Sequence, residues 1–301
     1  MFMNFFRNKA FPLMVLAATS LACGISVDTG LGKPTEIPPQ EAATQNVDIP
    51  QPTQIIPTEV IPAPTEEPTL SPNLNFVEFE GVSFSYDKSL AAGVTPEKMA
   101  AVPVNPDGAP WEFNPETINF PFSGYILQNT FHDPVIHIYP IADFEAMEAR
   151  ITDRITNLKT LLAGKPPAPE TIPFLPTWNA GQVLRANVKY LNFQNGSGVR
   201  FLTMYSQSYT PVNNNELFYS FQGLTDDGNY YISAILPVSH PSLPPDSSFI
   251  PGGDFDTFAN NYPAYSVEIT TNLSAQPSSS FSPNLDLLDA AIQSFLIQWS
   301  R

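Results

Sequence analysis

The chain has 301 residues, with 13 Lys and Arg against 29 Asp and Glu, so its formal net charge is −16. This acidic balance argues against a nucleic-acid partner, because phosphates require a basic surface. The single cysteine excludes an intrachain disulfide and a cysteine-based zinc site, and three histidines leave little room for a His-rich metal centre. We therefore expect no nucleic acid and no bound metal.

Residues 1–23 have the pattern of an export signal. Arg7 and Lys9 supply the positive charge that precedes the apolar residues 10–22, a stretch too short to span a bilayer. Small residues then lead to Cys23, the only cysteine of the chain. The pattern predicts that the rest of the protein is exported to the extracytoplasmic side of a membrane.

Cys23 is the candidate lipid attachment point. The segment Ser20-Leu21-Ala22-Cys23 resembles the lipobox of bacterial lipoproteins. In that family the cysteine after the cleavage site carries the lipid, so the resemblance implies anchoring to the outer face of a bacterial cell membrane. Ser20 and Ala22 also satisfy the small-x-small pattern of general signal peptidase cleavage, and plain secretion is therefore the alternative. A buried structural cysteine is a third reading, although nothing else in the segment is suited to a core.

Residues 24–73 are expected to form a disordered tether. They contain no aromatic residue, and ten prolines lie between Pro34 and Asn73. Such a segment buries too little apolar surface to offset its chain entropy, and its prolines favour an extended chain. The alternative is a variable linker without a spacer role. Both interpretations place a single globular domain at residues 74–301.

Three helices and an antiparallel sheet are expected in residues 74–301, which makes the fold class α+β. Apolar residues recur at spacings of three and four over 143–163, over 254–274 with a kink at Pro263, and after a Ser282-Pro283 cap near the C-terminus. Alternating or apolar runs predict strands at 82–86, 135–139, 182–193, 198–209, 217–224 and 229–238. The last four of these form a predicted four-strand meander that packs against helices.

A tight turn at Asp227-Gly228 fixes the register of the last hairpin. It pairs Phe221 with Ala234 and Tyr219 with Leu236, and it gives one nearly apolar face that should meet the helices.

The second face of the same hairpin mixes aromatic and polar side chains. Phe218, Gln222 and Tyr231 lie on it with two serines. This mixture suits stacking combined with hydrogen bonding, so we expect the face to be half exposed and these three residues to bind a ligand. The alternative is that a helix covers the face and the aromatic residues belong to the core.

The order of these elements resembles that of the PsbP-like family of α+β sandwiches. The resemblance is carried by short segments, namely Gly81-Val82-Ser83-Phe84-Ser85-Tyr86, Tyr139-Pro140, the hairpin at 218–236 and Ala291-Ile292-Gln293-Ser294-Phe295. The loop at 239–284, with its own helix, departs from the common pattern. Membership would imply an accessory or binding role, since most proteins of the family are non-catalytic and many are exported. No functional residue carries over from the family.

Motifs for catalysis or cofactor binding are absent from the sequence. No Gly-x-Ser-x-Gly elbow and no phosphate-binding glycine loop occurs, so we expect no cofactor. His132 and His137 lie five residues apart, which places them on opposite faces of a strand and predicts separate structural roles. His240 precedes a proline in a loop and is expected to face solvent.

The distribution of charge limits the ligand class. Residues 201–300 contain nine acids and no Lys or Arg. This half of the domain lacks the cations that hold phosphate or carboxylate groups, which favours a neutral or cationic ligand or a protein partner. We expect a non-enzymatic binding or accessory module. An exported hydrolase of a neutral polymer and a purely structural surface protein are the alternatives.

Overall fold

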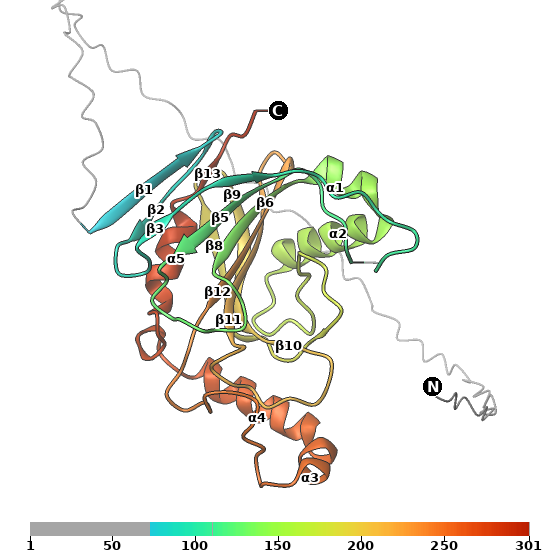
Figure 1. Ribbon diagram of the computed structural model, residues 1–301, viewed down its shortest axis with the longest axis vertical. Coiled ribbons are helices and arrows are strands. Elements are labelled where there is room, and N and C mark those ends of the chain that lie inside the picture. Colours follow the sequence, from blue (N-terminus) through green and yellow to red (C-terminus); the bar gives the residue numbers. More distant parts are fainter. Residues whose placement is uncertain (1–72, 110, 301) are drawn as a thin grey trace, which may run out of the picture. The chain divides into compact units, whose positions relative to one another are not determined.

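The computed structural model describes residues 73–109 and 111–300. The predicted export signal at 1–23, Cys23 and all of the predicted tether except Asn73 lie outside the described residues. Within the described ranges the chain forms antiparallel sheets packed with helices, so the α+β fold class is confirmed (Figure 1). None of the helices in these ranges is long and apolar enough to cross a membrane.

The main sheet of the described chain has eight strands in the order β3-β5-β6-β12-β11-β9-β8, and β4 also pairs with β5. Its strands are β3 (Gly93–Val94), β4 (Glu97–Met99), β5 (Thr117–Ser123), β6 (Val135–Pro140), β8 (Ala186–Phe193), β9 (Gly196–Thr203), β11 (Phe218–Thr225) and β12 (Tyr230–Pro237). The neighbours β8, β9, β11 and β12 are the predicted meander. The strands β3, β4 and β5, which the sequence pattern did not reveal, extend the sheet beyond β6.

The register of the last hairpin agrees with the prediction, since Phe221 lies opposite Ala234 and Tyr219 opposite Leu236. Its turn contains Gly228 at φ 73°, a left-handed conformation that glycine adopts without steric cost. Asp227 stabilises the turn by accepting a hydrogen bond from the backbone N–H of Asn229 at 3.0 Å.

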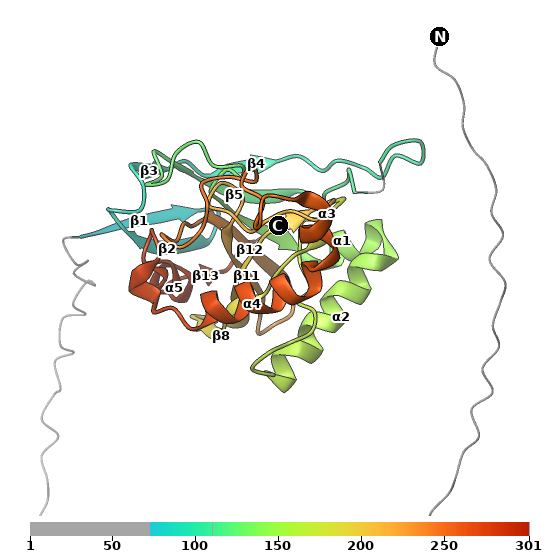
Figure 2. The same ribbon diagram turned by 90° about the horizontal axis from the view of Figure 1, so that it is seen from below.

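The first face of the main sheet is covered by helix α5 (Leu285–Gln293) and by a small sheet of strands β1 (Leu74–Phe79), β2 (Val82–Asp87) and β13 (Leu296–Ile297) (Figures 1 and 2). Phe84 of β2 stacks on Phe295 with ring centroids 4.1 Å apart, and both residues are buried. The expected Ser282-Pro283 cap is wrong, because Asn284 caps α5 and its side chain accepts a hydrogen bond from the backbone N–H of Asp286 at 2.9 Å. The helix ends at Gln293, and the chain then turns so that Leu296 and Ile297 pair with β2.

The second face is covered by helices α1 (Ile141–Met147) and α2 (Ala149–Gly164) and by the segment that follows them (Figure 1). The prediction of one continuous helix here is wrong at Glu148, which has an extended backbone at φ −159°. The Glu148 side chain accepts a hydrogen bond from the backbone N–H of Arg150 at 3.4 Å. A new helix therefore begins at this residue with its own N-cap.

Helices α3 (Phe255–Asn260) and α4 (Tyr262–Ser274) replace the single kinked helix expected around Pro263. The break lies at Asn261, so Pro263 stands in the first turn of α4, where a missing N–H costs no hydrogen bond. Asp254 caps α3, because its carboxylate accepts a hydrogen bond from the backbone N–H of Thr257 at 2.8 Å.

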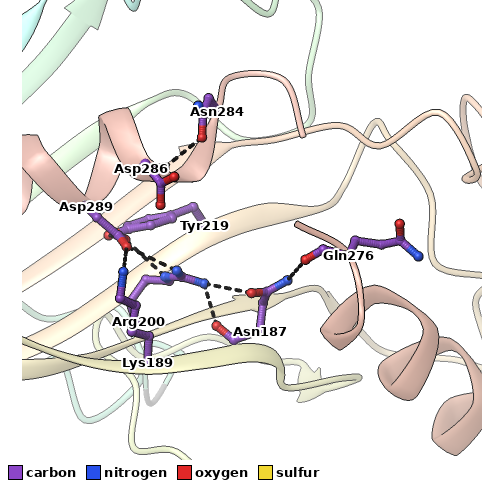
Figure 3. Close-up of polar contacts among 8 residues, drawn as sticks. All are labelled: Asn187, Lys189, Arg200, Tyr219, Gln276, Asn284, Asp286 and Asp289. Atoms are coloured by element: carbon purple, nitrogen blue, oxygen red, sulfur yellow. Dashed lines mark hydrogen bonds and ion pairs between the residues drawn. The ribbon is translucent and has the colours of Figure 1, made fainter. Parts of the chain in front are cut away.

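A buried ion pair joins α5 to the main sheet (Figure 3). Arg200 of β9 is 2% exposed, and its Nε and Nη2 atoms donate to the two carboxylate oxygens of Asp289 at 3.0 and 3.1 Å. Asp289 also accepts hydrogen bonds from Lys189 Nζ at 2.8 Å and from the Tyr219 hydroxyl at 3.0 Å. Burial raises the pKa of Tyr219 well above its usual value, so the hydroxyl keeps the proton that it donates.

The same arginine reaches helix α4 through Asn187. Arg200 Nη1 donates to the Asn187 backbone carbonyl at 2.5 Å. Asn187 in turn donates from its side-chain amide to the Leu273 carbonyl at 2.9 Å and from its backbone N–H to Ser274 Oγ at 3.1 Å. The ion pair and its extension therefore position both α5 and the C-terminal end of α4 against β8 and β9.

Replacing Asp289 with Ala should destabilise the domain by about 3–5 kcal/mol, because Arg200 would remain buried without its counter-ion. Lys189→Met is the matched control. The Lys189 side chain is half exposed, so replacing it should lower the free energy of unfolding by about 1 kcal/mol or less. Urea unfolding of both variants measures the difference. Equal and small losses in the two variants would contradict the role of the ion pair.

Candidate functional site

The three residues predicted to bind a ligand from the second sheet face are buried. Phe218, Gln222 and Tyr231 each have 0% of their surface exposed. The expectation of a half-exposed face is therefore wrong, and the alternative of a covered face is correct.

Hydrogen bonds to a covering loop explain why polar residues occupy this buried face. The Gln222 side-chain oxygen accepts from the backbone N–H of Leu175 at 3.0 Å and from the Tyr231 hydroxyl at 2.6 Å. Its amide nitrogen donates to Ser220 and Ser233, and the Ser233 hydroxyl donates to the Leu175 carbonyl. A loop that crosses a sheet face must satisfy its backbone polar groups, and these side chains do so.

An open groove lies at the margin of this covered face and is the candidate functional site. Its volume is about 620 Å³. Segments distant in sequence meet there, and the described residues that line it are Trp111, Phe131, His132, Trp178, Asn179, Ala180, Tyr205, Ser206, Gln207, Ser208 and Glu216. Tyr205 and Ser206 form strand β10 (Tyr205–Ser206), which pairs with β7 (Gly181–Gln182), and the other lining residues lie in loops.

Aromatic rings make up one part of the groove lining, called the wall. The His132 imidazole is parallel to the Trp178 indole, with 4.9 Å between centroids and 4° between planes. The same imidazole lies edge-on to Phe218 at 4.7 Å, and Tyr205 stacks on Phe218 at 6.2 Å. Phe218 therefore supports the groove from below, although its own side chain is inaccessible. Phe131, at 69% exposed, is the most open ring of the wall.

Uncharged polar groups form another part of the groove lining, called the rim. Asn179, Ser206, Gln207 and Ser208 present amides and hydroxyls along it. The Gln207 side-chain amide donates to the Asn179 backbone carbonyl at 2.7 Å, which joins two of the lining segments. The rim can therefore donate and accept hydrogen bonds toward a ligand that lies against the rings.

The groove carries little charge. Glu216 is the one carboxylate among the described lining residues, and none of them is Lys or Arg. Burial lowers the pKa of His132 to about 4, and the opposing effect of nearby Asp133 is smaller. His132 is therefore neutral at pH 7, and Glu216 supplies the groove's net charge.

A second hollow, of about 570 Å³, adjoins the groove, and the groove itself is the first hollow. Its described lining consists of Gly181, Gln182, Val183, Ser206, Gln207, Ser208, Tyr209, Phe255 and Tyr262. Ser206, Gln207 and Ser208 line both hollows. Tyr209 and Phe255 are 53% and 49% exposed, so the second hollow also offers aromatic surface to a ligand.

The histidines have structural surroundings. His137 lies on β6, and its Nδ1 atom is 2.7 Å from Asn119 Oδ1 on β5, whereas His132 stands in the groove wall. The two histidines are separate as predicted, but His132 precedes β6, so the expectation that they lie on opposite faces of one strand is wrong. The expectation that His240 faces solvent is wrong, since it is 5% exposed and its ring nitrogens lie 2.7 Å from Ser242 Oγ and 3.2 Å from Ser280 Oγ.

The described lining of the groove offers no pair of carboxyl groups of the kind that glycosidases use, and the described residues offer no metal-binding cluster. A glycosidase needs two carboxyl groups about 5–9.5 Å apart across the scissile bond, and the described lining contains only Glu216. No cluster of three or more His, Cys, Asp or Glu suited to a metal ion occurs among residues 73–109 and 111–300. The arrangement is suited to binding by stacking and hydrogen bonding.

Comparison of the chain with protein-family models, with curated proteins and with solved structures gave no match. The resemblance to the PsbP-like family therefore stays a prediction. Inference about function depends on the chemistry of the groove itself.

Trp111, Phe131 and Trp178, which line the groove, were not predicted from the sequence. All three lie in loops, where helical or strand periodicity gives no information about the direction of a side chain. Their signal in the sequence was the presence of large aromatic residues outside every predicted element, since a loop on the surface has no core in which to bury them.

Stability should fall as the pH is lowered from about 6.5 to about 4. Histidine in an unfolded chain has a pKa near 6.5. Burial lowers the pKa of His132 and of His137 to about 4 in the folded protein. In this window the unfolded state binds more protons, so acid favours unfolding. Melting temperature measured against pH tests this.

The double variant His132→Phe, His137→Gln is the comparison for that measurement. The melting temperature of this variant should fall much less between pH 6.5 and 4 than that of the wild type. A smaller decline should remain, because burial also lowers the pKa of His240. An unchanged decline in the double variant would contradict the assignment.

Proposed function

We propose that this protein is an exported, lipid-anchored and non-enzymatic binding module on the extracytoplasmic face of a bacterial membrane. The groove lined by Trp111, Phe131 and Trp178 binds the ligand of the protein, which is neutral or cationic. The observation that carries this proposal is an open, aromatic-lined groove whose described lining has a single charged group, Glu216.

The charge of the groove supports the choice of ligand class. An anionic ligand would need Lys, Arg or a protonated histidine, and the described lining offers a neutral His132 and no other candidate. A neutral ligand meets aromatic faces and uncharged hydrogen-bonding groups. A cation would in addition be attracted by Glu216 and by the negative faces of the rings.

The absence of a paired catalytic group supports binding without turnover. Glu216 has Asn213 Nδ2 at 3.4 Å as a neighbour and no second carboxylate beside it among the described groove residues. A glycosidase needs two such groups in defined positions. The resemblance to the mostly non-catalytic PsbP-like family points in the same direction.

The N-terminal sequence supports the location. Cys23 follows an apolar export segment, and residues 24–73 have the composition of a long spacer. A domain held in this way would sample the space next to a membrane and present its groove to ligands there.

Small probes test the groove. Saturation-transfer NMR on the full chain should detect binding of methyl glucoside, a neutral probe, or of tetramethylammonium, a cationic probe. Phe131→Ala should weaken that binding about tenfold, because one aromatic stacking contact contributes about 1–1.5 kcal/mol. Phe76→Ala, which removes a 51% exposed ring from strand β1, outside the groove, is the control. Binding of neither probe, or equal effects of the two variants, would refute the proposal.

Subcellular fractionation tests the anchor. Cys23→Ser should move the protein from the membrane fraction to the soluble fraction. A diacylglyceryl group supplies two acyl chains, which hold a protein stably where one chain would bind only marginally. Ser26→Ala, a change three residues further on, should leave the distribution as in the wild type. A membrane-bound Cys23→Ser protein would exclude lipidation at this residue.

A further inference from the structure

The two hollows are neighbours along one continuous surface segment. Ser206, Gln207 and Ser208 line both of them, and this shared segment is called the ridge. Phe131 is the exposed ring of the first hollow, and Tyr209 is an exposed ring of the second. Each hollow therefore offers an exposed aromatic ring, and the two hollows share the polar ridge.

The ridge is held in place by its own hydrogen bonds. Ser206 Oγ lies 2.6 Å from Thr210 Oγ1 and accepts from the backbone N–H of Ser208 at 3.2 Å. The Gln207 amide donates to the Asn179 carbonyl at 2.7 Å. Such a ridge presents hydroxyls in fixed positions, which lowers the entropy lost when a ligand binds.

The second hollow is fixed by helix α4. The Tyr262 hydroxyl donates to the Thr210 carbonyl at 3.0 Å, and its ring lies 4.9 Å from that of Tyr209. Phe258 of α3 packs edge-on to Tyr262 at 5.4 Å. The half-exposed Tyr209 therefore packs on the partly buried Tyr262, which in turn packs on the buried Phe258, so Tyr209 offers a defined surface for stacking.

The small charge of the two linings narrows the class of ligand that fits these aromatic and polar surfaces. The described lining of the second hollow has no Asp, Glu, Lys or Arg, and that of the first has Glu216 alone. A sugar ring has an apolar face of C–H groups that packs on an aromatic ring, and a rim of neutral hydroxyls that bond to amides and hydroxyls. A chain of such rings repeats this combination at each unit.

We propose that the two hollows are successive subsites for a linear, neutral saccharide chain. One sugar stacks in the first hollow beside Phe131, a further sugar stacks in the second beside Tyr209 and Phe255, and hydroxyls between them bond to the ridge at Ser206–Ser208. The inference rests on the proposed function and narrows its ligand to one chemical class. The chain is held without cleavage.

Calorimetric titration of the full-length protein tests the subsites. The probes are the hexasaccharides and disaccharides of glucose, mannose, xylose and N-acetylglucosamine. At least one hexasaccharide should bind about tenfold or more tightly than its disaccharide, because only the longer chain occupies both hollows. The double variant Tyr209→Ala, Phe255→Ala should remove most of that difference. Phe249→Ala, which removes a 58% exposed ring that lines neither hollow, should preserve it.

Three outcomes would overturn the inference. If no saccharide binds while tetramethylammonium does, the groove is a binding site for another ligand, and the proposed function stands. If disaccharide and hexasaccharide bind equally, the second hollow is not a subsite. If a neutral polyproline peptide displaces the hexasaccharides and binds more tightly than every one of them, the two hollows form a peptide-binding site. Release of reducing ends would instead refute binding without turnover.

Discussion

The position of the groove depends on a charge buried in the sheet. Arg200 must be paired, because an isolated guanidinium in the core would be strongly destabilising, and Asp289 and Asn187 supply its partners. Through Asn187 this requirement places the end of helix α4 against β8. Helix α4 then holds the segment after β10, since Tyr265 accepts the backbone N–H of Val212 at 2.8 Å and Tyr262 donates to the Thr210 carbonyl. A core ion pair thereby determines where the surface ridge between the hollows lies.

The part of the groove lining around Trp178 depends on hydrogen bonds from the second face of the main sheet. Gln222 and Ser233 bind both backbone groups of Leu175, which fixes the loop after α2 across the sheet. Phe174 and Trp178 belong to that loop, and their rings lie 4.7 Å apart. Both faces of the sheet thus carry a small polar network whose role is to attach an irregular segment. The groove forms where the two attached segments meet, which is why its residues come from loops and yet hold defined positions.

The sequence predicted the parts of this fold that are governed by local rules. The Asp227-Gly228 turn specified the hairpin register, and the register agrees at Phe221 and Ala234. The sequence pattern of the hairpin's second face did not show whether that face is exposed or buried. Serine and glutamine between apolar residues are compatible with solvent and equally with the backbone of a covering loop, and only the path of residues 165–180 decides between them. Arg200, a lone cation between apolar residues of β9, was the available sign of a buried ion pair.

The chemistry of the groove also has a consequence for affinity. Each aromatic contact contributes about 1–1.5 kcal/mol and each hydrogen bond to a neutral group about 1 kcal/mol, while association itself is costly. One hollow alone would therefore hold one sugar weakly. When a ligand already occupies one hollow, its binding to the second hollow costs little further translational and rotational entropy. A ligand long enough to reach both hollows should therefore bind more tightly than a short one. If many copies are anchored on one membrane, as proposed, the same reasoning applies between molecules, since one long chain can contact several grooves. Weak, uncharged and repeated contacts of this kind suit retention of a polymer rather than capture of a small molecule.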